Sequence, residues 1–315
     1  MKSDINVLKL SELGAAASQP PTPVEQGKNF KASLISRILL APSVIPLFVW
    51  MIVPLVLTLY FSVQHYSLLN KDTSFAGLEN FRYIVSNPDL LRSLINTVLL
   101  TCGVMAGTIV IGVPAAVLLH QKFIGQKIVR LMVIAPFFVM PTVAAVVWKN
   151  LLMNPVNGLF AFVATYLGFH AVDWFADLPL TSIGIIVTWQ WMPFATLVLL
   201  TALQSLDNEQ LEAAKMDGAG PISLMRYIIL PHLGRAISVV VMLEAIFLLS
   251  VFAEILVTTS GGPGTASTTL SYMIYKTALL NFDVGGASAI GIVAVILANV
   301  VAVVLVRTVA RSIDR

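Results

Sequence analysis

The sequence has few charged residues, one cysteine and none of the common catalytic or metal-binding motifs. Only 11% of its 315 residues are charged, whereas a soluble globular domain usually carries about 25%. Cys102 is the only cysteine, which excludes an internal disulfide and gives thiol catalysis no support. No G-x-x-x-x-G-K-[ST] phosphate loop, H-E-x-x-H metal motif or G-x-S-x-G nucleophile motif occurs. We therefore predict no ATP, metal or cofactor site and no catalytic residue in this chain.

Apolar residues, by contrast, are abundant and lie in long runs. A helix needs about 20 apolar residues to cross the hydrocarbon core of a bilayer. Six runs have about this length, at residues 38–63, 94–119, 129–150, 182–204, 236–258 and 287–306. They do not alternate as the strands of a membrane barrel do. We therefore predict an all-α integral membrane protein, with six transmembrane helices in one domain over residues 38–306.

The positions of the basic residues predict how the chain is oriented. With the amino terminus in the cytoplasm, 14 of the 19 lysine and arginine residues fall in cytoplasmic segments, as the positive-inside rule requires. Both termini are then cytoplasmic, residues 1–37 as a tail with little fixed structure and residues 307–315 as a short tail. The first apolar run is too long for a cleaved signal peptide. Because the basic residues orient the chain, the net charge of +3 predicts no nucleic-acid partner.

The predicted cytoplasmic segment 205–234 has the pattern of two short helices. Asp207, with Gln210 three residues later, has the form of a capping box that starts a helix. Gly218 can end this helix in the left-handed conformation, and Pro221 can start a second one. Helices of about ten residues are unstable alone in water, so we expect this pair to dock on another protein. A linker with incidental helicity is the alternative.

Part of this segment resembles the EAA loop of ABC importer permeases. The family pattern is E-A-A-x3-G-x9-I-x-L-P, and every fixed position is matched at the right spacing. The matching residues, with one aspartate of the fuller carbohydrate-type pattern, are Glu212, Ala213, Ala214, Asp217, Gly218, Ile228, Leu230 and Pro231. Asp207 and Met225 depart from the family, in which a proline and an aromatic residue are common there.

Other segments extend the resemblance over most of the chain. Residues 75–81 are similar to the external F-x-G-L-x-N-[FY] segment of maltose-type permeases, and Asn96-Thr97 follows at the expected place. Gly-Gly-Pro at 261–263 matches the segment after the fifth helix, whereas Ala161 stands where an asparagine is common. These matches favour the carbohydrate branch of the family.

The resemblance implies a function and a set of partners. The chain would be one transmembrane subunit of an ATP-driven importer in the bacterial inner membrane. A second six-helix permease subunit, an extracytoplasmic solute-binding protein and two ATPase subunits would complete it. The ATPase subunits would hold ATP and Mg²⁺ and dock on the EAA loop, where Glu212 makes a polar contact and Gly218 forms the turn. Residues 253–259 and 281–286 look like polyol permeases, so the expected solute is sorbitol, mannitol or a small sugar.

Polar and aromatic side chains inside the apolar runs are candidates for the solute pathway. A carboxylate near the bilayer centre costs about 2.5–3.5 kcal/mol, so Glu244 should face the protein interior, either lining the path or pairing structurally. Glu254 lies near the end of its run and can instead reach water. Aromatic faces stack on sugar rings and amides bond hydroxyl groups, although plain packing is the alternative. The candidates are Trp189, Gln190, Trp191, Glu244, Ser250, Phe252 and Glu254.

Three other functions compete with this interpretation. An ion-coupled secondary transporter explains six helices and Glu244, but not the EAA loop. A membrane-embedded enzyme with Glu244 and Glu254 as acid and base is disfavoured, because ten helical residues place them about 15 Å apart along the axis. An ABC permease for another solute class, such as amino acids or peptides, is the third, and residues 75–81 argue against it.

Overall fold

The computed structural model describes residues 23–70 and 73–313, and the chain divides into two units, residues 1–57 and 58–315. The described residues are mostly helical and contain no β-structure beyond two isolated bridges. Among them, five helices are long and apolar enough to cross a membrane, and a bent pair adds a sixth if both halves form one span. The predicted all-α membrane fold is confirmed.

The first unit holds most of helix α2 (Pro23–Ser62). Its apolar stretch begins at Leu40, and nearly every side chain from there to Leu57 is exposed within the chain. The predicted lack of fixed structure is wrong for residues 23–37, because Pro23 suits the first turn of a helix and no further proline interrupts it before Pro42. Residues 1–22 lie outside the described residues.

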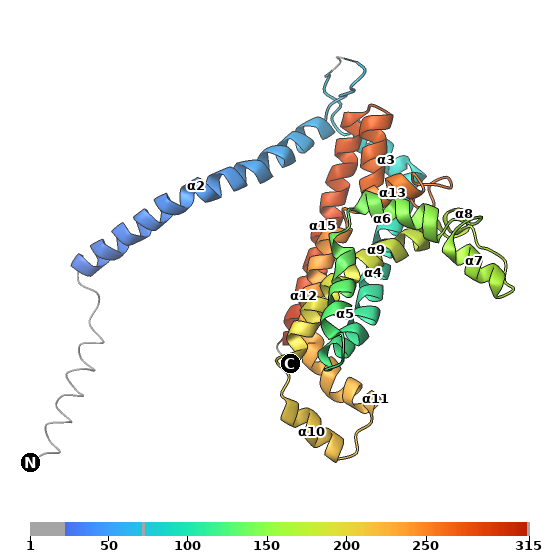
Figure 1. Cartoon of the computed structure of the whole chain (residues 1–315). Helices are drawn as coiled ribbons and strands as arrows, with labels where there is room; N and C mark the ends of the chain where they lie inside the picture. The colour runs from blue at the N-terminus through green and yellow to red at the C-terminus, as the bar shows by residue number, and fades with distance from the viewer. Residues whose placement is uncertain (1–22, 71–72, 314–315) are drawn as a thin grey trace, which may run out of the picture. The chain divides into compact units, whose positions relative to one another are not determined.

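The second unit is built on four long helices, α4 (Pro88–His120), α9 (Pro179–Leu203), α12 (Leu230–Leu248) and α15 (Val284–Ile313), which lie along one another (Figure 1). One apolar cluster joins α4, α9 and α12 through Val104, Val187 and Leu248. A second cluster joins the same helices through Leu119, Leu199 and Leu233. Because α15 continues to Ile313, the predicted tail at 307–315 is helical over its described part.

The third predicted span is not one helix. It consists of α5 (Gln126–Ile134), the 3-10 turn η1 (Ala135–Phe138), α6 (Pro141–Val147) and the π-turn η2 (Trp148–Leu152). The two halves meet at an angle of 105°. Proline lacks an N–H and disfavours a helical residue before it, so Pro141 ends the first half, with Val139 and Met140 extended.

The fifth predicted span begins earlier and ends earlier than residues 236–258. Helix α11 (Pro221–Leu224), the π-turn η3 (Met225–Ile229) and α12 form one continuous helix over Pro221–Leu248. Pro231 gives no N–H to the carbonyl four residues before it, which accounts for the wider turn that precedes α12. The chain then leaves the helix, with Phe252 at φ −146°, and α13 (Ala253–Thr258) follows.

Shorter helices flank the long helices of the second unit. They are α3 (Glu79–Ser86), α7 (Leu159–Tyr166), α8 (Trp174–Asp177), α10 (Asn208–Met216), α14 (Leu270–Tyr275) and the π-turn η4 (Lys276–Leu280). Of these, α7 and α8 project from the side of the long helices (Figure 1). Helices α10 and α11 mark one end, which we call the α10 end, and α3 and α13 mark the opposite end, the α3 end (Figure 1).

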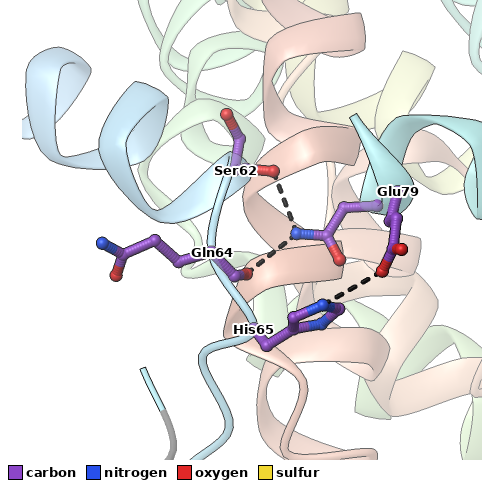
Figure 2. Close-up of polar contacts among 5 residues, drawn as sticks. Ser62, Gln64, His65 and Glu79 are labelled. Carbon is purple, nitrogen blue, oxygen red and sulfur yellow. Dashed lines mark hydrogen bonds and ion pairs between the residues drawn. The ribbon is translucent and has the colours of Figure 1, made fainter. Parts of the chain in front are cut away.

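A polar junction at the α3 end ties the segment after α2 to α3 and α15. Asn80, the asparagine of the F-x-G-L-x-N-F segment, donates from Nδ2 to the carbonyls of Ser62 and Gln64, both at 2.9 Å. His65 Nε2 lies 3.0 Å from Glu79 Oε2 (Figure 2). These side chains position the backbone of residues 62–66 against the start of α15.

Gly285 lets the backbone of α15 approach this junction. Its N–H donates to the carbonyl of Tyr66 at 3.0 Å. A Cβ placed on Gly285 lies only 2.3 Å from the carbonyl oxygen of Gln64. No side chain fits there without movement of the backbone.

Gly285→Ala is therefore expected to destabilise the protein by about 1–3 kcal/mol, the usual cost of overpacking. The measurement is thermal unfolding of the detergent-purified protein. Gly291→Ala, on the same helix, is the control, because its Cβ meets Thr58 Cγ2 at an ordinary 3.5 Å. Equal unfolding temperatures for the two variants would contradict the close approach.

Candidate functional site

The segment 207–231 at the α10 end folds as two helices around a glycine turn. Asp207 Oδ1 accepts a hydrogen bond from the N–H of Glu209 at 2.9 Å and so caps α10. Gly218 has φ +82°, and its N–H donates to the carbonyl of Lys215 at 3.0 Å, which closes the helix as expected for a left-handed glycine. The predicted helix and turn are confirmed, and Asp207 caps the helix, although through the N–H of Glu209 and not through the predicted pairing with Gln210.

One face of segment 207–231 is anchored to the long helices. Leu211 and Ile228 are partly buried against the cluster that contains Leu119, Leu199 and Leu233. His232 Nε2 lies 2.9 Å from the carbonyl oxygen of Ala202, so the start of α12 is held to the end of α9. The motif residue Ile228 therefore packs inward.

The other face is exposed and partly apolar. Glu212, Ala213 and Gly218 are exposed, and on either side of the turn Met216 and Ile222 are 89% and 83% exposed. Exposed apolar groups with a polar surround mark surfaces for protein contacts. The sequence reasoning missed Met216 and Ile222, although their position beside the turn was a usable signal.

The other motif residues lie near this turn without forming a single patch. Ala214 is partly buried, whereas Asp217, Leu230 and Pro231 are exposed. Leu230 and Pro231 start α12, so η3 separates them from the turn at Gly218. Among the motif residues, Ile228 and Ala214 are thus partly buried and the others are exposed.

The three solute-pathway candidates on α9 lie in different surroundings. Trp189 contacts Trp148, with ring centroids 5.7 Å apart, in a cluster with η2. Gln190 is buried, and its Nε2 donates to the carbonyl of Val139 at 3.3 Å, at the bend of the third span. Trp191 faces neither of these groups. Since only Trp191 contacts a half-exposed aromatic surface, it is the strongest of the three pathway candidates.

That surface is an aromatic group formed by Phe137, Trp191, Phe194 and Phe247. The Trp191 ring lies 5.3 Å from Phe247 and 5.9 Å from Phe137, and Phe137 stacks on Phe194 at 6.1 Å. Phe247 is 56% exposed and Phe137 is 41% exposed. Sequence reasoning missed the three phenylalanines. Phe194 follows Trp191 by three residues on one helix face, which was a usable signal for that residue alone.

The two glutamates lie inside the subunit. Glu244 is fully buried, and Thr108 Oγ1 lies 2.7 Å from its Oε2. Glu254 is 5% exposed, and its carbonyl accepts a hydrogen bond from Thr258 Oγ1 at 2.6 Å. Neither carboxyl group therefore opens onto the surface of the chain that carries the aromatic group.

Ser250 and Phe252 lie at the break between α12 and α13. Phe252 contacts Tyr275, with ring centroids 4.7 Å apart, and packs on the cluster that also receives Trp191. Ser250 lines a groove of about 540 Å³ between α12 and α15, together with Ser271 and other mostly apolar residues. The structure thus places Trp191 and Phe252 near one another through a shared cluster.

Side chains from other helices satisfy the backbone around this break. Ser271 Oγ donates to the carbonyl of Leu249 at 2.8 Å. At the other end of α13, Lys149 Nζ donates to the carbonyl of Thr258 at 2.6 Å. A cation at the carboxyl end of a helix also meets the negative end of its dipole. Nothing in the sequence indicated that Ser271 would contact Leu249 or that Lys149 would contact Thr258.

Asn96 and Thr97 on α4 hold the loop 259–269 at the α3 end. Asn96 Nδ2 donates to the carbonyls of Thr265 and Thr268 at 3.0 and 2.9 Å. Thr97 Oγ1 accepts from the N–H of Leu270 at 2.9 Å. The side chains that the loop buries, Ser267, Thr268 and Thr269, are thereby kept in one arrangement.

A search of the described residues for metal ligands finds no group of three or more histidine, cysteine, aspartate or glutamate side chains that could hold an ion. The polar groups of the site are instead single side chains bonded to helix carbonyls.

The sequence left several kinds of membrane protein open, and comparison with known families distinguishes among them. Residues 108–315 match the family described as "Binding-protein-dependent transport system inner membrane component". The chain belongs to this family. It is therefore a membrane component of a transport system, as the segment 207–231 predicted, and the match covers α9, α12 and α15 together with that segment.

Curated relatives agree with this assignment. The chain is 34% identical over 241 residues, 76% of its length and 78% of the relative, to the "Probable ABC transporter permease protein y4oQ" of Sinorhizobium fredii. It is 29% identical over 272 residues, 85% of its length and 91% of the relative, to the "Trehalose/maltose transport system permease protein MalF" of Thermococcus litoralis.

A solved structure has the same fold. The chain aligns with a chain of a bacterial ABC transporter involved in the import of the acidic polysaccharide alginate, with a TM-score of 0.75. The alignment covers 91% of this chain and 98% of that one, at 20% identity. The two chains therefore share one fold over nearly their whole length.

Asn96→Ala is expected to loosen the loop 259–269, because the buried carbonyl of Thr268 and the partly buried carbonyl of Thr265 lose their donor, at a cost of about 1–3 kcal/mol. Hydrogen exchange of residues 259–269 measures this loosening. Asn299→Ala is the control, since Asn299 is exposed and its Nδ2 donates only within its own helix, to Val295. Unchanged exchange in Asn96→Ala would show that the loop is held by other contacts.

Proposed function

We propose that this chain is a transmembrane subunit of an ATP-driven carbohydrate importer, with a polyol or small sugar as solute. The family membership and the relative named as a trehalose/maltose permease support the carbohydrate class. The segments 253–259 and 281–286, which resemble polyol permeases, support the narrower choice.

The exposed face of segment 207–231 is the observation that carries this proposal. A polar side chain, Glu212, and two apolar ones, Met216 and Ile222, surround a turn that is fixed from behind by Leu211 and Ile228. A rigid, exposed surface with both polar and apolar side chains suits stable binding of another protein. We infer that the partner is an ATPase subunit, which binds the ATP and Mg²⁺ that this chain has no motif to hold.

The remaining partners and the orientation follow from the same proposal. The positive-inside rule puts the α10 end and both termini in the cytoplasm. The α3 end then faces an extracytoplasmic solute-binding protein. A second six-helix subunit, different from this one, would complete the pathway beside the aromatic group, in a complex with two ATPase subunits in the inner membrane.

Coupling would pass along one helix. Because α11, η3 and α12 are continuous over Pro221–Leu248, a movement of the turn at Gly218 is carried directly to Phe247 and the break at residues 249–252. Closure of the two ATPase subunits would in this way switch the pathway between inward-facing and outward-facing states. No separate mechanical element is required.

The aromatic group is the solute contact that the geometry favours. Its rings are half exposed in the single chain, and aromatic faces pack against the apolar faces of sugar rings and polyol chains. Ser250, at the break beyond Phe247, adds a hydroxyl group, and Phe252 adds a further ring. Trp189 and Gln190 do not contact the solute in this proposal and instead hold the bent third span in place.

Gly218→Pro and Glu212→Lys are expected to abolish ATP-dependent uptake while the protein stays in the membrane. Proline cannot adopt the φ of +82° found at Gly218, and lysine reverses the charge of the docking face. Uptake by cells and co-purification of the ATPase subunit are the measurements. Asp177→Lys, an exposed aspartate outside this segment, should leave both unchanged. Normal uptake in both variants would refute the assignment.

Trp191→Ala and Phe247→Ala are each expected to lower uptake of labelled sorbitol or mannitol by about two- to tenfold, since a ring contact contributes about 0.5–1.5 kcal/mol. ATP hydrolysis by the assembled complex should persist, because neither residue lies in segment 207–231. Phe162→Ala, which removes an exposed ring from α7, is the control. Wild-type uptake in both variants would place the solute path elsewhere.

A further inference from the structure

Glu244 is a fully buried acid without a basic partner. Its side chain is 0% exposed, and no described lysine, arginine or histidine nitrogen lies within 4.0 Å of it. Its Oε2 is 2.7 Å from Thr108 Oγ1, and its Oε1 has no hydrogen-bond partner among the described residues. A charged carboxylate placed in this way would be poorly compensated.

The hydrogen bonds of Thr108 indicate where the proton lies. Thr108 Oγ1 is 2.9 Å from the carbonyl oxygen of Met105 as well as 2.7 Å from Glu244 Oε2. A hydroxyl group has one proton and cannot donate to both oxygens. Both contacts are satisfied if Glu244 is the neutral acid, because its Oε2–H donates to Thr108 Oγ1 while the Thr108 hydroxyl donates to Met105.

The helices around Glu244 bring no charge that would change this assignment. On α12 the nearest ionisable residue is Arg235, about 13.5 Å away along the axis. Helix α9 has no ionisable residue. Arg226 and Tyr227 of η3 lie about 27 and 25.5 Å from Glu244 along the continuous helix. On α15, the ionisable residue among the described side chains is Arg307, in the last turns of the helix. On α4, Cys102 is about 9 Å from Thr108 along the axis, and the others are the terminal residues Asp89, Arg92 and His120.

We propose that Glu244 is a positioning residue for transport, a neutral acid whose hydrogen bond to Thr108 makes α4 and α12 move as one body. Helix α12 continues from segment 207–231, whereas α4 holds the loop 259–269 through Asn96. The bond therefore connects the two ends of the subunit. Its link to transport rests on the function proposed above, but the protonation state does not.

Infrared spectroscopy of the complex in lipid tests the proton directly. The difference spectrum between wild type and Glu244→Gln at neutral pH should contain the C=O band of a protonated carboxylic acid. Thr108→Val should shift this band, since the acid loses its acceptor. A carboxylate band in the difference spectrum would overturn the proposal, whether or not the chain works with an ATPase.

Uptake tests the positioning role. Glu244→Gln keeps a neutral donor and Thr108→Ser keeps the hydroxyl, so both should retain uptake within about twofold across pH, whereas Glu244→Ala and Thr108→Val should lose about tenfold. Loss of uptake in Glu244→Gln equal to that in Glu244→Ala, at the same amount of protein in the membrane, would show that the charge itself is needed. Full uptake in Thr108→Val would exclude the bond as a coupling element.

Discussion

Inside a bilayer, a backbone carbonyl or N–H that leaves a helix finds no water, so another part of the protein must bond it. This constraint explains the polar contacts at three interruptions of the helices. At the bend of the third span, Gln190 donates to the carbonyl of Val139. At the break after α12, Ser271 donates to the carbonyl of Leu249, and at the end of α13, Lys149 donates to the carbonyl of Thr258. Each helix interruption is therefore also a point at which two distant segments are held together.

The sequence predicted the parts of the fold that depend on composition and local pattern. Long apolar runs identified the spans, and Asp207 and Gly218 identified the limits of α10. It did not predict the bend at Pro141 or the break near Phe252, since proline and serine also occur in uninterrupted membrane helices whose neighbours satisfy them. The surroundings of Glu244 were equally out of reach, because they depend on how α4 packs on α12.

The EAA pattern combines residues with different physical tasks. Glu212 and Ala213 are exposed on α10, Gly218 has the left-handed backbone conformation of the turn, and Ile228 packs against the apolar cluster of Leu119, Leu199 and Leu233. Pro231 coincides with the change from π-turn to α-helix. A pattern that looks like a single contact surface in the sequence thus includes residues that shape the backbone and pack inward, beside a few that are exposed.

The continuous helix Pro221–Leu248 also has a geometric consequence. Its 28 residues give it a length of about 42 Å at 1.5 Å per residue. A rotation of about 10° at one end would displace the other by about 7 Å over this length. A slight tilt of this helix at the α10 end would therefore be enlarged into a displacement wider than a side chain at Phe247.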